Sequence, residues 1–388
     1  MGVKVCGLGV VSAIGVGCAE SLASLCGEVC GIAPLTLFES EVNSPVGEVK
    51  LSNDELKELL GIESGRSVSR TALLGALAAR EAVRDANIEA GRRVGLISAT
   101  SVGGMDLSEE FYRDYIKDCT KGRLRDIVGH DCATSTNLIA EICGVDGFRT
   151  TISTACSSAA NAIIMGAQML ECDMLDYVVV GGCDALCRFT YNGFNSLMIL
   201  DSELCRPVDS SRKGLNLGEG GGYLVLTKDE GCAKSYCNLV GYANANDAHH
   251  QTASSAEGNG AYLAMSEALA MSGLAKIDYI NLHGTGTPNN DSSELAAITR
   301  LFTESLPLCS STKSATGHTL AASGGVEATF SVLSLIEGRV WANLRFQEAI
   351  EPYDIEPVRH LIECDNIESV MTNSFGFGGN CSSLIFAI

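Results

Sequence analysis

One stretch of the chain, residues 151–172, constrains the fold and the chemistry more than any other, and it reads TISTACSSAANAIIMGAQMLEC. The β-branched residues 150–152 predict the end of a buried strand, and the alanine-rich run that follows predicts a helix. Cys156 stands at the junction between the two. Free backbone N–H groups and the helix dipole at such a junction favour the thiolate, which is the nucleophilic form of cysteine. We therefore expect Cys156 to be a nucleophile that needs no dedicated base, whereas most of the other cysteines are expected to be inert core residues.

The bulk composition restricts the class of protein. The 388 residues suffice for two domains or one large pseudo-duplicated domain, and 46% apolar with 19% charged residues is typical of a well-buried globular enzyme. The formal net charge of -20 leaves no basic surplus to neutralise phosphates, which argues against a nucleic-acid partner. An acidic protein partner would need a local basic patch, and the clearest one in the sequence is Lys117, Lys121, Arg123 and Arg125.

Cysteine usage and hydropathy predict the compartment. The seventeen cysteines are odd in number and scattered, and the opening MGVKVCGLGVVSAIG lacks the basic start of a signal peptide. Two CxxxC pairs, Cys26/Cys30 and Cys183/Cys187, have no second pair at zinc-site spacing, so we expect no metal site. No apolar run reaches the length of a membrane span. These features predict a cytoplasmic protein with reduced thiols and no membrane span.

Apolar patterning along the chain predicts alternating strands and helices. Residues 3–8, 94–99 and 177–181 read as strands, and residues 67–86 and 320–337 as largely buried helices. This alternation indicates an α/β fold with largely parallel sheets, divided near residues 231–235 into halves 1–232 and 233–388. The Gly7-Leu8-Gly9 turn lacks the third glycine and the acidic residue of a dinucleotide-binding fingerprint, so we reject that interpretation.

Four further motifs place polar residues among small ones at the ends of predicted strands, where α/β proteins assemble their sites. NLHGTGTP carries His283, and STKSATGH carries Lys313 and His318 ahead of a helix with Glu327. A Lys313–Glu327 pair would keep the lysine charged while the histidines stay neutral. The glycines of NSFGFGGN suit an oxyanion hole, because they let backbone N–H groups approach a ligand. The fourth motif, CRPVDSSRKG followed by GEG, is better interpreted as a salt-bridged structural loop.

Taken together, TACSS, HGTGTP, KSATGH and NSFGFGG resemble, in that order, the β-ketoacyl-acyl-carrier-protein synthases of the thiolase-like superfamily. The resemblance runs from VCGLGVVSAIG to the C-terminus and so covers essentially the whole chain. It implies two similar α/β halves packed as five alternating αβαβα layers, usually in a dimer. It also implies decarboxylative condensation of malonyl-carrier protein with an acyl group held on Cys156, driven by loss of CO₂ without a metal or organic cofactor.

The resemblance carries residue roles with it. It makes Cys156 the acyl acceptor, and His283 and His318 the pair that promotes decarboxylation and steadies the enolate. The remaining roles are the supporting ion pair Lys313–Glu327, the pantetheine-binding threonines Thr285 and Thr287, the tunnel residues Thr252 and His250, and Phe377, the gate whose N–H joins that of Cys156 in the oxyanion hole. For an acidic carrier protein, we expect docking on Arg66, Lys121 and Arg123.

Departures from the family pattern favour a specialised synthase, for example of aryl-polyene type. Gly378-Gly379 runs into Asn380-Cys381, where the family usually has Thr-Asn, and Leu215-Asn216 replaces a usual phenylalanine. Two alternatives stay open. One is a non-catalytic chain-length partner of a ketosynthase, a subunit type that usually lacks the cysteine. The other is a coenzyme-A-dependent thiolase-like acyltransferase, which typically replaces one histidine. A homodimer and a heterodimer with a chain-length factor are both compatible with the sequence.

Overall fold

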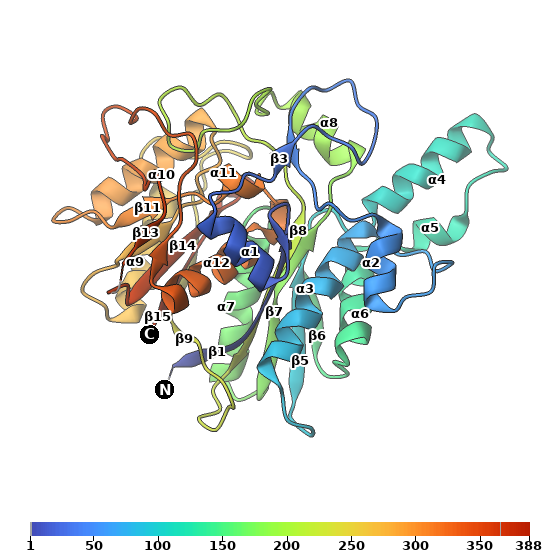
Figure 1. The fold of residues 1–388 in the computed structure, drawn as a ribbon, viewed down its shortest axis with the longest axis horizontal. Helices are drawn as coiled ribbons and strands as arrows, with labels where there is room; N and C mark the ends of the chain where they lie inside the picture. Colours follow the sequence, from blue (N-terminus) through green and yellow to red (C-terminus); the bar gives the residue numbers. More distant parts are fainter. Residues whose placement is uncertain (1, 365) are drawn as a thin grey trace.

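The computed structural model describes residues 2–364 and 366–388, and its central feature is one large mixed sheet (Figure 1). Its strands follow the order β11-β10-β14-β15-β9-β1-β8-β7-β5-β6, and β2 pairs with β1. The first part of the chain contributes β1 (Val3–Ser12), β2 (Gly15–Val16), β5 (Val94–Ala99), β6 (Arg149–Ile152), β7 (Tyr177–Asp184) and β8 (Gly220–Thr227). The second part contributes β9 (Cys237–Asn246), β10 (Tyr279–Asn281), β11 (Leu308–Ser310), β14 (Ser369–Phe375) and β15 (Asn380–Ala387).

The sheet contains the same five-stranded pattern twice. Numbered by chain order within each set, β6-β5-β7-β8-β1 and β11-β10-β14-β15-β9 both have the order 3-2-4-5-1. In both sets the first two pairings are parallel and the next two are antiparallel. The sets join where β9 pairs with β1 over three residue pairs. This repetition confirms the predicted pseudo-duplicated α/β fold, and we propose residues 1–232 and 233–388 as its two halves.

Helices complete five layers. Helix α3 (Arg70–Ala86) covers β1, β7 and β8 on one face, and α9 (Asn259–Ser272) covers β9 and β15. Helices α7 (Ser158–Glu171) and α12 (Ser323–Glu337) lie between the two sets, because each contacts strands of both sets as well as the other helix. Each five-stranded set of the sheet forms one layer, with α7 and α12 between the two sets and α3 and α9 outside them. The resulting order helix, sheet, helix, sheet, helix is the predicted αβαβα arrangement.

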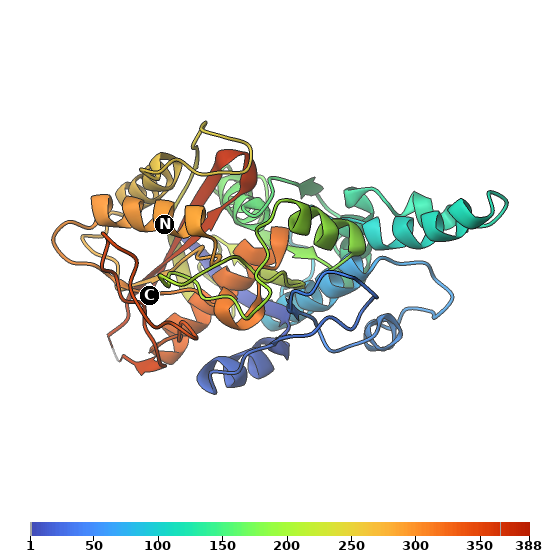
Figure 2. The ribbon, with the colours of Figure 1, turned by 90° about the horizontal axis from the view of Figure 1, so that it is seen from above.

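The remaining elements surround this core. The helices are α1 (Cys18–Cys26), α2 (Asn53–Leu60), α4 (Met105–Lys117), α5 (Leu124–Val128), α6 (Cys132–Cys143), α8 (Arg188–Ser196), α10 (Pro288–Leu301) and α11 (Lys313–Thr316), with 3-10 turns η1 (Leu320–Ala322) and η2 (Phe377–Gly379). Two small ribbons pair β3 (Ile32–Ala33) with β4 (Val46–Gly47), and β12 (Arg339–Val340) with β13 (Ile362–Glu363). Helices α4 and α5 extend away from the body of the molecule (Figure 2).

The prediction of largely parallel sheets is wrong. Strand β5 pairs in parallel with β6 and β7, but β7 pairs antiparallel with β8, and β8 antiparallel with β1. Both faces of these strands are covered by helices, so their sequences are continuous apolar runs whichever way the neighbouring strand points. Hydrophobic patterning therefore detected the strands without revealing their direction.

Gly7-Leu8-Gly9 lies inside strand β1 rather than in the predicted turn, and its glycines have a packing role. A Cβ on Gly7 would lie 2.3 Å from the carbonyl oxygen of Ala82, and one on Gly9 would lie 2.0 Å from that of Ala78. The glycines therefore let β1 approach the backbone of α3 closely, which accounts for them without a bound nucleotide.

The prediction that no apolar run reaches the length of a membrane span is wrong for Leu320–Glu337, the one helical stretch of the described chain that is long and apolar enough to cross a membrane. In the structure 89% of it is buried, so packing between the two sheets accounts for its composition. The run also breaks: Leu320 has a φ of 55°, and only the part from Ser323 continues as α12.

All seventeen cysteines are free thiols.

Candidate active site

Cys156 lies in the turn that joins β6 to α7, as predicted. The residue before it, Ala155, has a φ of 53°, a conformation that costs a non-glycine residue free energy and is found mainly where function requires it. Ser158 holds this turn, because its Oγ accepts from the Thr154 N–H at 2.7 Å and donates to the Ala155 carbonyl at 2.6 Å. The cysteine itself is only 7% exposed.

The expectation that the helix end alone makes Cys156 a thiolate is wrong. Burial raises the pKa of the Cys156 thiol to about 11, while the Lys313 charge and the Phe377 N–H lower it by less. Helix α7 begins only at Ser158, and desolvation of a buried thiolate outweighs the field of the helix terminus. The resting form at neutral pH is therefore the thiol.

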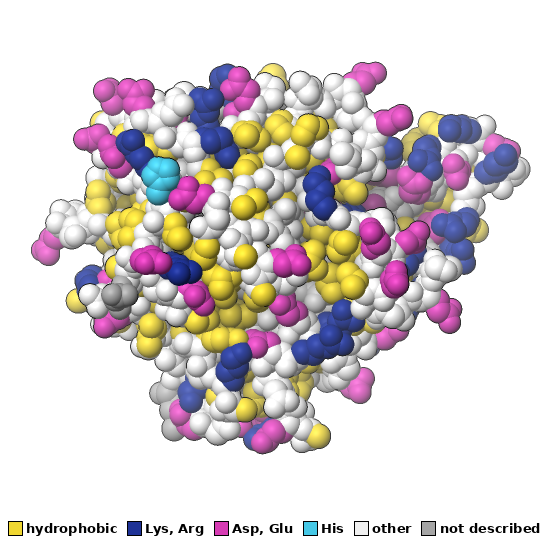
Figure 3. All heavy atoms as spheres, viewed as in Figure 1, with side chains coloured by type: hydrophobic (Ala, Val, Ile, Leu, Met, Phe, Trp, Pro, Cys, Tyr) yellow, Lys and Arg dark blue, Asp and Glu magenta, His cyan; other side chains and the backbone are white. Residues whose placement is uncertain are grey.

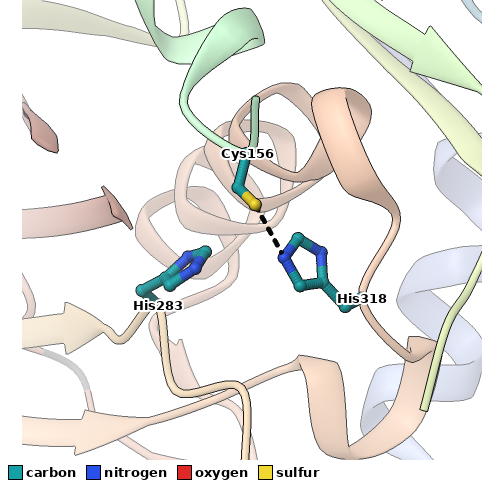
Figure 4. Close-up of side chains that lie close together, drawn as sticks. All are labelled: Cys156, His283 and His318. Carbon is teal, nitrogen blue, oxygen red and sulfur yellow. Dashed lines mark hydrogen bonds between the residues drawn. The ribbon is translucent and has the colours of Figure 1, made fainter. Parts of the chain in front are cut away.

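The two histidines converge on this sulfur from the second half of the chain (Figure 4). The His318 Nε2 lies 3.1 Å from the Cys156 Sγ, and the rings of His283 and His318 stand nearly perpendicular with centroids 5.4 Å apart. The His318 Nδ1 accepts the Leu320 N–H at 3.1 Å. Since a backbone N–H can only donate, the proton of neutral His318 resides on Nε2 and points at the sulfur.

Lys313 gives His283 the same tautomer. Its Nζ lies 3.3 Å from the His283 Nδ1, and it also donates to the Glu327 carboxylate. Burial and, after it, the Lys313 charge hold the pKa of both histidines well below the ordinary value. Burial raises the pKa of Glu327 to about 7, against the opposing effect of Lys313. Both imidazoles are thus neutral N–H donors, which is the pattern expected from a lysine held beside them.

The same geometry bears on metal binding. One donor atom each from Cys156, His283 and His318 lies within 4.8 Å of the other two, a spacing that could hold a metal ion. A metal needs the lone pair of the ring nitrogen. In His318 that nitrogen carries the proton, because Leu320 occupies the other one. The arrangement is therefore better suited to donating hydrogen bonds to a substrate oxygen than to holding a metal.

The glycine-rich loop after β14 packs directly on the nucleophile turn. A Cβ on Gly376 would lie 3.1 Å from the Cys156 nitrogen, and the Phe377 N–H is directed at Cys156. Two backbone N–H groups, those of Cys156 and Phe377, can therefore face one oxygen of a bound thioester, as an oxyanion hole requires.

Asn380 joins this loop to the nucleophile turn, a function that the sequence interpretation missed. Its Oδ1 accepts from the Ser157 Oγ at 2.6 Å and from the Asn161 and Asn244 amides at 2.8 Å each. Its backbone carbonyl accepts the Gly376 N–H at 2.8 Å. The departure at Asn380 was visible in the sequence, but nothing there indicated that its partners lie on α7 and β9.

Asp184 is a second missed residue. It is fully buried and accepts from the Thr100 Oγ1 and from the backbone N–H groups of Ser101, Val102 and Ala321. Burial raises its pKa to about 6. This carboxylate therefore ties the loop after β5 to η1, beside His318.

A cavity of about 220 Å³ leads to the three catalytic candidates and is lined by Thr285, Thr287, Thr252, His250 and Phe377 among others. The Oγ1 atoms of Thr285 and Thr287 lie 2.9 Å apart at this wall. The structure thus brings the predicted pantetheine residues to the cavity that ends at Cys156.

The three predicted docking residues do not line this cavity. Arg66 forms a two-pronged hydrogen bond with Glu141, at 2.7 Å each, and Arg123 pairs with Asp126 at 3.0 Å. Within residues 2–364 and 366–388, no ion-pair partner is found for Lys121. Basic side chains lie on the projecting end formed by α4 and α5, where acidic side chains are interspersed with them (Figure 3).

Comparison with known proteins agrees with this geometry. The chain matches the Beta-ketoacyl synthase, N-terminal domain, over residues 2–231 and the Beta-ketoacyl synthase, C-terminal domain, over residues 236–347. It is 31% identical over 409 residues to 3-oxoacyl-acyl-carrier-protein synthase 2 of Vibrio cholerae, covering 99% of this chain and 98% of that protein.

Solved structures give the same result. The ishigamide ketosynthase/chain length factor superposes with a TM-score of 0.94 at 27% identity, covering 99% of this chain and 98% of that one. A type II PKS acyl-carrier protein in complex with its ketosynthase matches with a TM-score of 0.88 at 26% identity, covering 100% and 99%. The fold and the buried Cys-His-His cluster thus define a condensing acyltransferase. The chain belongs to the β-ketoacyl synthase family.

Proposed function

We propose that this protein condenses malonyl-acyl-carrier protein with an acyl group held on Cys156, giving 3-oxoacyl-acyl-carrier protein in fatty-acid or specialised polyene or polyketide elongation. The observation that carries the proposal is the meeting of one buried sulfur with two neutral imidazoles, at 3.1 Å in the case of His318. Pantetheine-linked substrates would enter along Thr285, Thr287 and Thr252.

In the first half-reaction, the Cys156 sulfur attacks the acyl thioester and the carrier thiol leaves. The thiol proton ends on the departing pantetheine sulfur, so no net charge is created. The N–H groups of Cys156 and Phe377 hold the oxygen that becomes negative in the transition state, each contributing on the order of 3 kcal/mol. Because the resting thiol has a pKa near 11, the hydrogen bond from the His318 Nε2 supports the developing thiolate.

In the second half-reaction, malonyl thioester loses CO₂ and leaves an enolate. Its oxygen accepts from the Nε2 protons of His283 and His318, whose tautomers Lys313 and Leu320 set. The carbanion then attacks the acyl carbonyl, the bond to the Cys156 sulfur breaks, and 3-oxoacyl-carrier protein forms. The departing Cys156 thiolate takes up one proton from solvent, which restores the resting thiol. The Lys313–Glu327 pair supports both histidines, because burial and, after it, the lysine charge keep them neutral.

A non-catalytic chain-length partner and a coenzyme-A-dependent thiolase-like enzyme are less well supported. A non-catalytic subunit would have no use for the strained Ala155 turn or for the two imidazoles aimed at its sulfur. Activity with carrier-bound rather than coenzyme-A-bound malonyl groups separates the proposal from the second alternative.

The protein partners are a carrier protein and a second ketosynthase-type subunit, either a second copy or a chain-length factor. The relatives with solved structures are described as a ketosynthase/chain length factor and as a ketosynthase with its acyl-carrier protein. On this chain the projecting α4 and α5 expose Tyr112, Ile116, Leu124 and Val128, each more than 60% accessible. Such a patch is typical of a surface that another subunit covers. The free cysteines are consistent with a cytoplasmic location.

Intact-mass analysis after incubation with carrier-bound acyl thioesters tests the proposal directly. We expect one acyl group per chain on the wild type and none on Cys156→Ala. Loss of label from the acylated enzyme on addition of malonyl-carrier protein, with appearance of the 3-oxo product, would complete the cycle. Equal labelling of wild type and variant would refute the assignment of the nucleophile.

A further inference from the structure

A second cavity opens on the other side of Cys156. It has a volume of about 380 Å³, and its lining includes Ala155, Phe194, Leu197 and Leu320. These side chains are apolar, and the cavity reaches the sulfur from the side away from the histidine pair, since His283 and His318 line only the first cavity. An acyl chain attached to Cys156 is apolar and therefore matches the apolar lining of this cavity.

This cavity adjoins a third, larger hollow. The two share Ser101, Val102 and Phe189, and the larger one has a volume of about 890 Å³. It follows the projecting helices α4 and α5, where Phe111, Tyr112, Ile127 and Val128 line it. Phe189 stands at the junction and is 65% exposed. A chain longer than the inner cavity can therefore continue past Phe189, along a wall with two aromatic rings.

Polar side chains also line the larger hollow, and one of them, His130, has a ring nitrogen without a hydrogen-bond partner among the described residues. Glu109 is occupied by the backbone N–H groups of Arg188 and Phe189, and Asp131 caps α6 by accepting from the Ala133 N–H. His130 is a solvent-exposed residue at the rim of the hollow; it accepts or donates at Nδ1 with the Ser108 Oγ at 2.7 Å, and its Nε2 has no hydrogen-bond partner among the described residues.

The charges around His130 restrict what it can bind. With Glu109 and Asp131 both lining the same hollow, an anionic group would meet like charge. A neutral hydroxyl can donate to or accept from the imidazole, and an aromatic ring that bears it can pack on Phe111 and Tyr112.

We propose that the acyl group on Cys156 extends past Phe189 and that His130 binds a neutral hydroxyl or phenol group near its distal end. The natural substrate is then a long acyl chain with a polar, uncharged terminus rather than a plain alkyl chain. This inference rests on the proposed function. A partner subunit bound on α4 and α5 would cover the larger hollow from outside, and this chain would supply the wall that carries His130.

The test compares rates of Cys156 acylation by three pantetheine thioesters: a short acyl chain, a long chain ending in a methyl group, and the same long chain ending in a hydroxyl group. Intact-mass time courses give each rate. We expect the hydroxyl-ended chain to react about tenfold faster than the methyl-ended one, as one additional hydrogen bond allows. His130→Leu should abolish this ratio, while His360→Leu, the same change at an exposed histidine outside the groove, should preserve it.

Phe189→Trp provides a second variant, and we expect it to slow both long chains relative to the short one, because a larger ring narrows the junction. Equal rates for the two long chains on the wild type, or a ratio that survives in His130→Leu, would overturn the inference while leaving the proposed function intact. Failure of all three thioesters to label Cys156 would instead count against the proposed function.

Discussion

Replacing Lys313 with Met removes the only cation from a fully buried cluster, and the effect on stability can be worked out from Glu327. Both side chains are at most 3% exposed, and they are hydrogen-bonded to each other. Breaking a buried pair by removing one partner costs about 3–5 kcal/mol. In the wild type, with Lys313 present, the shift of the Glu327 pKa from 4.5 to about 7 already corresponds to a cost of about 3 kcal/mol for the ionised carboxylate. Without the lysine, the pKa of Glu327 should rise further.

The loss depends on pH with a definite sign. Because the pKa of Glu327 is already raised to about 7 in the wild type, both the wild type and Lys313→Met lose stability as the pH rises from 4.5 towards 7. The pKa of Glu327 is higher still in the variant, so the stability difference between the two proteins opens above about pH 7, where it grows by up to about 1.4 kcal/mol per pH unit. The variant should therefore lose about 3–5 kcal/mol at alkaline pH and clearly less in mild acid.

Urea unfolding monitored by tryptophan fluorescence is the assay. The single tryptophan, Trp341, is fully buried and donates to the Phe330 carbonyl on α12, the helix that carries Glu327. Lys313→Met/Glu327→Gln is the matched control, because a neutral amide needs no cation, and it should recover most of the stability without recovering activity. A loss below about 1 kcal/mol at alkaline pH, or a double variant no more stable than the single one, would refute the argument.

Three further predictions concern the active site and its surroundings. Alkylation of Cys156 by iodoacetamide should quicken about tenfold per pH unit up to a pH near 11, and a plateau below neutral pH would contradict the buried thiol. Asn380→Ala should lower the acylation rate about 100-fold, with KM little changed, because the nucleophile turn loses the Asn380 Oδ1 that holds Ser157 and Asn161 beside the glycine-rich loop, whereas Asn380→Asp retains the acceptor oxygen and more of the rate. A loss in KM alone would argue against that role. Charge reversal at Arg66, Lys121 and Arg123 should raise KM for the carrier protein and leave hydrolysis of a small thioester unchanged; an unaltered KM would remove the docking surface.

Local residue patterns were sufficient to predict the positions of many strands and helices of this protein. The strand over residues 94–99 has the predicted bounds, and Ser69 caps the helix expected over residues 67–86. Such features depend on neighbours in sequence, which is why patterning finds them. The positions of Cys156 and His283 at strand ends belong to the same class.

Other properties required groups that are distant in the chain. The direction of β8 against β7 depends on pairing between residues 36 to 50 positions apart, and the thiol state of Cys156 depends on how completely the second half of the chain excludes water from it. The Asn380 network and the four hydrogen-bond donors to Asp184 likewise join segments that no window of sequence contains.

The sequence by itself determined which residues could do chemistry and where strands and helices would form, since side-chain type and apolar spacing are local properties. Only the tertiary structure decided the protonation of the sulfur, the tautomers of His283 and His318, and the groove that continues to His130. Burial, hydrogen-bond partners and cavities are products of packing between distant segments, and a pKa or a tautomer follows from them rather than from the residue alone.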